Sequence, residues 1–134
     1  MFDVLDIGAS GLQAQRVRMD TIAGNVANIN TMRRAGKGSG PYQRRIAMFA
    51  TGQADDHAKP GVRVSEIGVD TSEGRKEYKP GHPDAGPDGY VRYPNIDLAV
   101  EVVNMMEASR AYEANVTTME VTKAMMNSSL RLIA

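Results

Sequence analysis

The sequence contains no cysteine and no tryptophan, and its aromatic residues are limited to two phenylalanines and five tyrosines. The absence of cysteine excludes disulfides, thiolate nucleophiles and metal sites with cysteine ligands. Ligand pockets and small globular cores usually rely on aromatic side chains, so their scarcity disfavours a compact enzyme. The nine methionines instead suit a surface that packs against several neighbours, although they would equally serve as core filler.

An excess of charge is also missing, because 16 basic residues balance 16 acidic residues. Bulk electrostatics therefore gives no reason to expect nucleic acid or an anionic membrane as a partner. No apolar run approaches the roughly 20 residues of a transmembrane segment. Residues 1–10 hold two aspartates and no basic residue, which is the wrong charge for a cleaved secretory signal peptide. We expect neither feature in this chain.

Proline and glycine are confined almost entirely to the middle of the chain. All six prolines and 10 of the 13 glycines lie between residues 33 and 94. Because these residues interrupt helices, the sequence predicts a mostly α fold with a small irregular or β-containing middle. Residues 1–32 and 95–134 are expected to be long terminal helices that pack as one coiled-coil assembly domain. Residues 33–94 are expected to form a small inserted domain of loops and short strands.

Both terminal segments repeat apolar residues at steps of seven, with adjoining rows three or four residues away. This spacing places the apolar side chains on one stripe of a helix, as in a coiled coil. Gln15 interrupts the first stripe, and Gly8 keeps it slim. The predicted assembly interface consists of Leu5, Leu12, Met19, Ile22 and Val26 in the first helix and Met105, Tyr112, Met119, Met126 and Ile133 in the last.

The apolar face of the last helix is wider than one seam. Val121, Met125 and Leu132 extend it beyond the heptad row, and a helix over residues 95–134 would be about 60 Å long. A first helix of 32 residues cannot cover such a face alone. The sequence therefore predicts a structural subunit whose terminal helices are completed by other subunits, and which becomes ordered as those neighbours bind.

The middle segment contains short β patterns separated by turns. Residues 42–49, 62–67 and 90–93 are predicted strands, and Asp88-Gly89 is a turn signal directly before the last of them. The acidic residues of the last helix, including Glu101 and Glu107, are interpreted as its solvated face. Asn95 or Asp97 is expected to cap that helix.

Two groups of residues raise the possibility of ligand chemistry. Gly36, Gly38 and Gly40 resemble a phosphate-binding loop, but they lead into a strand and not into a helix, which favours a flexible linker. His57 and His82 have carboxylates nearby, but both lie in polar, proline-flanked turns. We find no catalytic constellation and no cofactor motif, so the chain is not expected to be an enzyme. A small phosphate- or metal-binding module is the alternative from a different class.

Two motifs resemble a known family. Residues 25–31, Asn-Val-Ala-Asn-Ile-Asn-Thr, resemble the signature that closes the first helix in flagellar rod, hook and axial proteins. Residues 89–97, Gly-Tyr-Val-Arg-Tyr-Pro-Asn-Ile-Asp, and the run from Glu101 to Asn115 resemble flagellar basal-body rod proteins of the C type. Residues 40–42, 61–64 and 80–85 agree with that family in order. Residues 72–75 depart from it, because a Ser-Pro beginning is expected there.

The resemblance implies a structural subunit of the proximal rod of the bacterial flagellar basal body. It implies export by the flagellar export apparatus without signal cleavage, and assembly in the periplasm with copies of itself and with other rod proteins. The terminal helices would form the inner layer of a tube that transmits torque. Asn25, Asn28 and Asn30 would fix helix ends or make hydrogen bonds between subunits. Another rod protein of the same axial superfamily is the nearest alternative.

Overall fold

The computed structural model describes residues 2–32, 40–52, 55 and 59–133. Helix α1 spans Phe2–Ala27 and helix α2 spans Leu98–Ile133. Between them lie strands β1 (Arg45–Thr51), β2 (Val62–Val69), β3 (Lys76–Tyr78) and β4 (Tyr90–Arg92). The prediction of a mostly α chain with a short β middle is confirmed.

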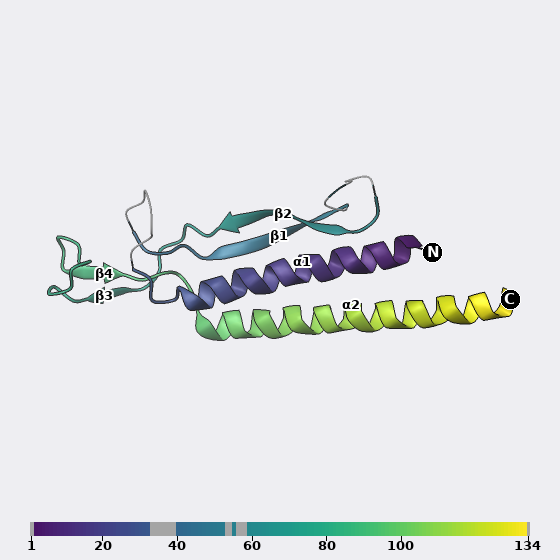
Figure 1. The fold of residues 1–134 in the computed structure, drawn as a ribbon. Coiled ribbons are helices and arrows are strands. Elements are labelled where there is room, and N and C mark those ends of the chain that lie inside the picture. The colour runs from purple at the N-terminus through teal and green to yellow at the C-terminus, as the bar shows by residue number, and fades with distance from the viewer. Residues whose placement is uncertain (1, 33–39, 53–54, 56–58, 134) are drawn as a thin grey trace.

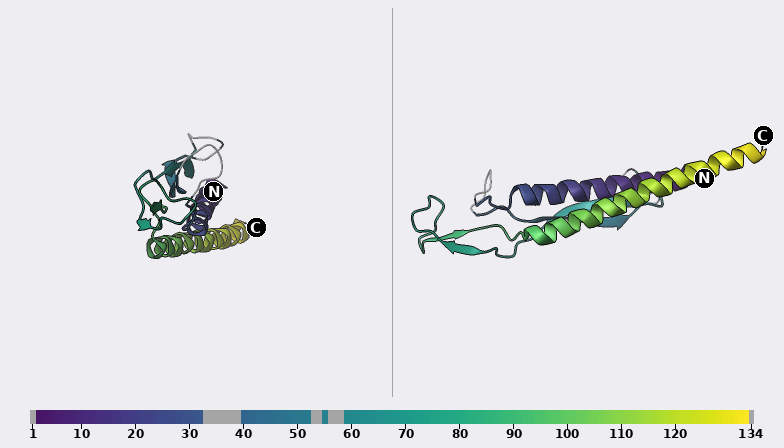
Figure 2. Two further views of the ribbon diagram at one scale, coloured as in Figure 1. Left: turned by 90° about the vertical axis from the view of Figure 1, so that its left-hand side faces the viewer. Right: turned by 90° about the horizontal axis from the view of Figure 1, so that it is seen from below.

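The two helices run antiparallel and side by side over the length of α1 (Figure 1). Helix α2 has 36 residues and contains neither proline nor glycine, so nothing in its sequence interrupts it. Asp97 caps its first turn, because Asp97 Oδ1 accepts a hydrogen bond of 2.9 Å from the backbone N–H of Ala99. Of the two predicted caps, Asp97 is the one that binds the helix. The end of α2 extends past the start of α1 (Figures 1 and 2).

Helix α1 ends at Ala27, five residues before the predicted boundary at residue 32. Asn28 Nδ2 donates to the carbonyl oxygen of Gly24 at 2.8 Å, and the Asn28 Oδ1 accepts from the Thr31 hydroxyl at 3.1 Å. These local bonds compete with helix continuation. The chain then turns away from the helix at residues 28–30.

Strands β1 and β2 form an antiparallel hairpin with an irregularity between Met48 and Phe49. The hairpin packs along α1 on the side opposite α2, so α1 is the middle layer of three (Figures 1 and 2). The sequence analysis assigns these strands to a separate middle domain. In the structure they lie along the terminal helices.

Strands β3 and β4 form a second antiparallel hairpin beyond the end of the helix pair (Figure 1). Gly89 takes the φ of +76° that its turn requires, and its N–H donates to the carbonyl oxygen of Gly86 at 2.9 Å. The turn predicted at Asp88-Gly89 is therefore present. Strand β3 was not predicted.

The buried interior is small. Its apolar members are Ala14, Ile22, Val91, Tyr93 and Ala108, and its polar members are Asn25, Glu101 and Thr122. Many large apolar side chains remain exposed on both helices and on the first hairpin. None of the helices described is both long enough and apolar enough to cross a membrane.

Candidate assembly interface

The structure buries two of the predicted interface residues and leaves the others partly or fully exposed. In α1, Ile22 is buried, and in α2 the predicted residue at the far end, Ile133, is 85% exposed. The remaining predicted apolar residues are half-buried: Leu5, Leu12, Met19, Val26, Met105, Tyr112, Met119 and Met126. Asn25 is buried, Asn28 is half-buried and Asn30 is exposed. The intrachain pairing therefore covers this set only partly.

The closest approach of the two helices uses small and polar residues. A Cβ atom built on Gly8 would lie 2.7 Å from Met119 Cγ, and one built on Gly11 would lie 3.0 Å from Asn115 Nδ2. Ala108 and Thr122 are buried in the same face of α2. Because the missing side chains let the backbones come close, this contact is narrower than the apolar stripes suggest.

A buried polar cluster joins the end of α1 to the start of α2. Asn25 Nδ2 donates to Glu101 Oε2 at 3.1 Å, and Arg44 Nε donates to Glu101 Oε1 at 2.7 Å. Asn25 also holds the backbone of Arg45 from both sides: its Oδ1 accepts from Arg45 N–H at 2.9 Å, and its Nδ2 donates to the Arg45 carbonyl at 2.8 Å. Tyr42 donates weakly to the same Oδ1 at 3.4 Å.

The sequence analysis predicts that Glu101 lies on the solvated face of α2, and this prediction is wrong. Its exposed fraction is 0%. The reason is tertiary: the first turn of α2 lies against Asn25, and Arg44 supplies an opposite charge that no helical periodicity reveals. Glu107, by contrast, is exposed as predicted, and it pairs with Arg18 of α1 at 2.8 Å.

The other side of α2 is left uncovered by the residues that the structure describes. Near its start, Val102, Val103 and Met106 are exposed, and near its end Val121, Met125, Leu130 and Leu132 are exposed. The C-terminal end of α2 continues past the start of α1 (Figure 2). Because Gly8 lies against Met119 and Gly11 against Asn115 in an antiparallel pair, this overhang begins at about residue 126 and ends with α2 at Ile133. Leu132 is 88% exposed there. The wide face that the sequence predicts for this helix is thus left uncovered by the chain itself.

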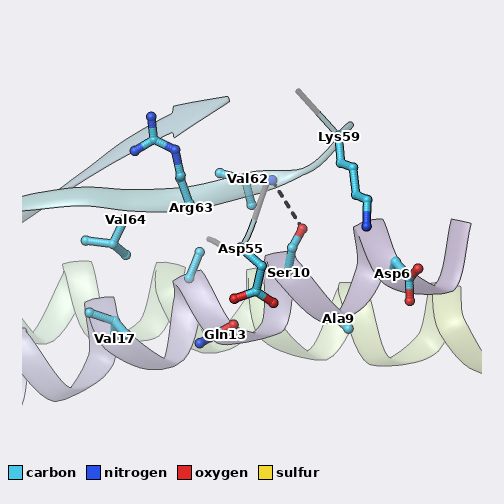
Figure 3. A pocket seen from close by; sticks show the side chains of 11 residues that line it. Asp6, Ala9, Ser10, Gln13, Val17, Asp55, Lys59, Val62, Arg63 and Val64 are labelled. Carbon is cyan, nitrogen blue, oxygen red and sulfur yellow. Dashed lines mark hydrogen bonds between the residues drawn. The ribbon is translucent and has the colours of Figure 1, made fainter. Parts of the chain in front are cut away.

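A groove of about 520 Å³ lies between the first half of α1 and the start of β2 (Figure 3). A hydrogen bond connects the two sides of the groove: the backbone N–H of Val62 in β2 donates to the Ser10 hydroxyl in α1 at 3.1 Å. Asp6 and Asp55 line it together with Lys59 and Arg63, so both signs of charge are present. Such a mixture favours neither a phosphate nor a cation.

Of the residues singled out for ligand chemistry, only Gly40 and His82 lie in the part of the chain that the structure describes. Gly36, Gly38 and His57 lie outside the described residues. His82 belongs to a turn, in which its Nδ1 accepts from the N–H of Asp84 at 3.1 Å and its carbonyl accepts from Ala85 at 3.0 Å. Over the part of the chain that the structure describes, no three potential metal ligands come together.

Comparison with known proteins identifies the relatives of this chain. Residues 5–33 match the family model described as "Flagella basal body rod protein", and residues 88–132 match "Flagellar basal body rod FlgEFG protein C-terminal". The flagellar basal-body rod protein FlgC of Borreliella burgdorferi is 37% identical, with 99% of this chain and 97% of the relative covered. The FlgC proteins of Bacillus subtilis (38%, covering 98% and 97%) and Aquifex aeolicus (40%, covering 92% and 90%) agree. The chain belongs to the FlgC family of flagellar basal-body rod proteins.

The matches to rod-protein models coincide with the helix pair. One covers nearly all of α1, and the other covers β4 and almost all of α2. Asn25 and Glu101, the centre of the polar cluster, lie inside the two matched regions. Both matches to rod-protein models therefore lie in segments that pack together in the fold.

The α2 row that faces α1 was missed by the search for apolar periodicity. Glu101, Ala108, Asn115 and Thr122 follow one another at steps of seven, but they are polar or small.

Proposed function

We propose that this chain is a structural subunit of the proximal rod, assembling helically with copies of itself and with other rod proteins through α1 and α2. Its role is to form part of the tube that transmits torque, and no catalytic step is assigned to it. The observation that carries the proposal is the apolar surface of α2 that remains after α2 has paired with α1. Because the chain belongs to a family of rod proteins, we infer that neighbouring rod subunits cover this surface.

The proposal includes the route and the place. The chain is exported by the flagellar export apparatus without signal cleavage and assembles in the periplasm. Support for the place comes from the FlgC relatives, which are named as basal-body rod proteins.

The test replaces one apolar side chain of the overhang. Leu132→Lys introduces a charge at a position that is 88% exposed, so the substitution disturbs little packing within the chain. Asn127→Lys is the matched control, because Asn127 is exposed in the same helix and polar already. Met119 is unsuitable for this purpose, because it packs against Gly8 within the chain.

Each variant replaces the native copy in the bacterium, and its amount is measured in purified basal bodies and in the exported fraction. We expect Leu132→Lys to be exported normally but to be depleted from basal bodies by about tenfold or more, since burying an unpaired charge is costly. Asn127→Lys should be incorporated normally. Normal incorporation and motility with Leu132→Lys would contradict the proposed interface at the overhang.

We also propose that order arrives in two stages. The end held by the polar cluster is ordered in the free chain, whereas the overhang becomes ordered when neighbours cover it. Amide hydrogen exchange on the purified chain tests this proposal. Slow exchange over residues 98–108 and fast exchange over residues 120–133 are expected, and equal protection along all of α2 would contradict it.

A further inference from the structure

Glu101 is a buried carboxylate whose two oxygens are held by two different parts of the chain. Oε2 accepts from Asn25 of α1, and Oε1 accepts from Arg44, which directly precedes β1. Glu101 itself lies in the first turn of α2, where α2 starts to pack against α1. One side chain in the first turn of α2 therefore contacts the end of α1 and the residue before the hairpin at the same time.

The charge of Glu101 makes these contacts interdependent. A carboxylate removed from water is strongly unfavourable unless a cation and hydrogen bonds compensate it. The Asn25 amide supplies a hydrogen bond but no charge, whereas Arg44 supplies both at 2.7 Å. Arg44 directly precedes β1, so it reaches Glu101 only when the hairpin lies along α1. If the hairpin is not docked, pairing of α2 with α1 buries the Glu101 carboxylate without a compensating cation.

Asn25 strengthens the same dependence from the other side. Its amide is 1% exposed and holds both backbone groups of Arg45, the first residue of β1. The Arg44 carbonyl in turn accepts from the N–H of Asp70, which follows β2, at 2.8 Å. The base of the hairpin is thus fixed to the same few atoms that join the two helices.

We propose that Asn25, Arg44 and Glu101 form a latch that makes helix pairing at this end and docking of the β1–β2 hairpin conditional on one another. In the free chain, the latched end of the helix pair and the hairpin then open and close as one cooperative unit. The inference rests on contacts within a single chain, so it stands or falls independently of the proposed assembly.

An exposed ion pair of the same composition provides the internal control. Arg18 of α1 and Glu107 of α2 are 2.8 Å apart, but the Glu107 side chain is 68% exposed. Exposed pairs contribute little, since water solvates either charge when its partner is lost. The same arginine substitution should therefore have different consequences at the two positions.

The experiment measures amide exchange of the full-length chain in Arg44→Met, Glu101→Gln, the double variant and Arg18→Met. Arg44→Met leaves the carboxylate buried and uncompensated, so exchange should accelerate about tenfold or more in both the hairpin and residues 98–108. Glu101→Gln removes the charge, so only the hairpin should exchange faster. The double variant should recover the slow exchange of residues 98–108, and Arg18→Met should match the parent there.

Each outcome decides the proposal. If Arg44→Met accelerates exchange in the hairpin alone, Arg44 is a local docking contact and the latch does not exist. Unprotected residues 98–108 in the parent chain would overturn it as well. Should Arg44→Met fail to fold, the double variant remains informative, because it lacks the same arginine: a folded double variant supports the latch, and an unfolded one contradicts it.

Discussion

Gly8 of α1 lies directly against Met119 of α2, so that a Cβ atom added to the glycine would lie 2.7 Å from Met119 Cγ and 3.1 Å from its sulfur. The sequence analysis names Met119 as an interface residue and Gly8 only as a thin position in the stripe. The structure makes them partners. A long flexible side chain fills the space that the absent one leaves.

Substituting alanine for Gly8 should lower the stability of the chain, whereas the same substitution at another helical glycine, Gly24, should not. Gly24→Ala should raise the free energy of unfolding by about 0.5–1 kcal/mol, because alanine restricts the unfolded chain and the nearest atom is 3.9 Å away. Gly8→Ala should lower it, because Met119 must move. Urea unfolding of both variants measures the difference. Equal stabilisation by the two substitutions would mean that the helices do not touch here.

Gln15 interrupts the apolar stripe of α1, and its Oε1 is buried without a hydrogen-bond partner among the described residues. Such an orphaned acceptor costs about 1–3 kcal/mol. Gln15→Met should therefore stabilise the chain by roughly that amount, as measured by chemical unfolding. The control is Gln13→Met on the exposed face, which should change stability by no more than about 0.5 kcal/mol. Destabilisation by Gln15→Met would show that the amide is satisfied in solution.

Asp97 caps α2, whereas Asn95 bonds elsewhere, its Nδ2 donating to the Ser72 hydroxyl at 3.0 Å. Asp97→Ala should cost about 1 kcal/mol of unfolding free energy, because the N–H of Ala99 loses its acceptor. Asp97→Ser should recover most of it. Asn95→Ala serves as the comparison and should leave the exchange of the first amides of α2 unchanged. If Asn95→Ala caused the larger loss, the cap would be misassigned.

The pKa of Asp70 is held below its ordinary value, chiefly by the hydrogen bond from the Ser72 hydroxyl and next by the bond from the Ser72 N–H. A carboxyl whose folded pKa is lowered adds stability above its unfolded pKa, and that stability disappears as the pH falls through the folded value. Ser72→Ala should raise the pKa of Asp70, as followed by carboxyl NMR titration. Ser65→Ala, which removes a hydroxyl bonded to Met48, should leave it unchanged.

The long elements of the fold are predictable from the sequence because their signals are local. Helix α2 follows from a stretch without proline or glycine, and its start follows from Asp97. Strands β1, β2 and β4 were predicted within a few residues. Strand β3 was missed, because Lys-Glu-Tyr has no apolar alternation and becomes a strand only by pairing with residues 90–92.

The interface could be predicted only in outline. Apolar periodicity finds the stripes that contain Ile22 and Met119, but it does not show how closely two helices approach. Glu101 was misinterpreted because helical spacing alone cannot reveal Arg44, which lies 57 positions earlier in the sequence. Long-range charge pairing is a property of the folded chain. The Leu132→Lys experiment tests the wider apolar face of α2 for contacts with other subunits.

The helix pair is flush at one end and stepped at the other, where residues 126–133 continue for about two turns beyond α1. A two-fold dimer that joins two stepped ends end to end leaves both flush ends unpaired. Copies that meet end to end through such surfaces make heterologous contacts, which leave one unmatched end at every length. A row of these molecules is therefore polar: the end formed by the overhang of α2 differs from the opposite end.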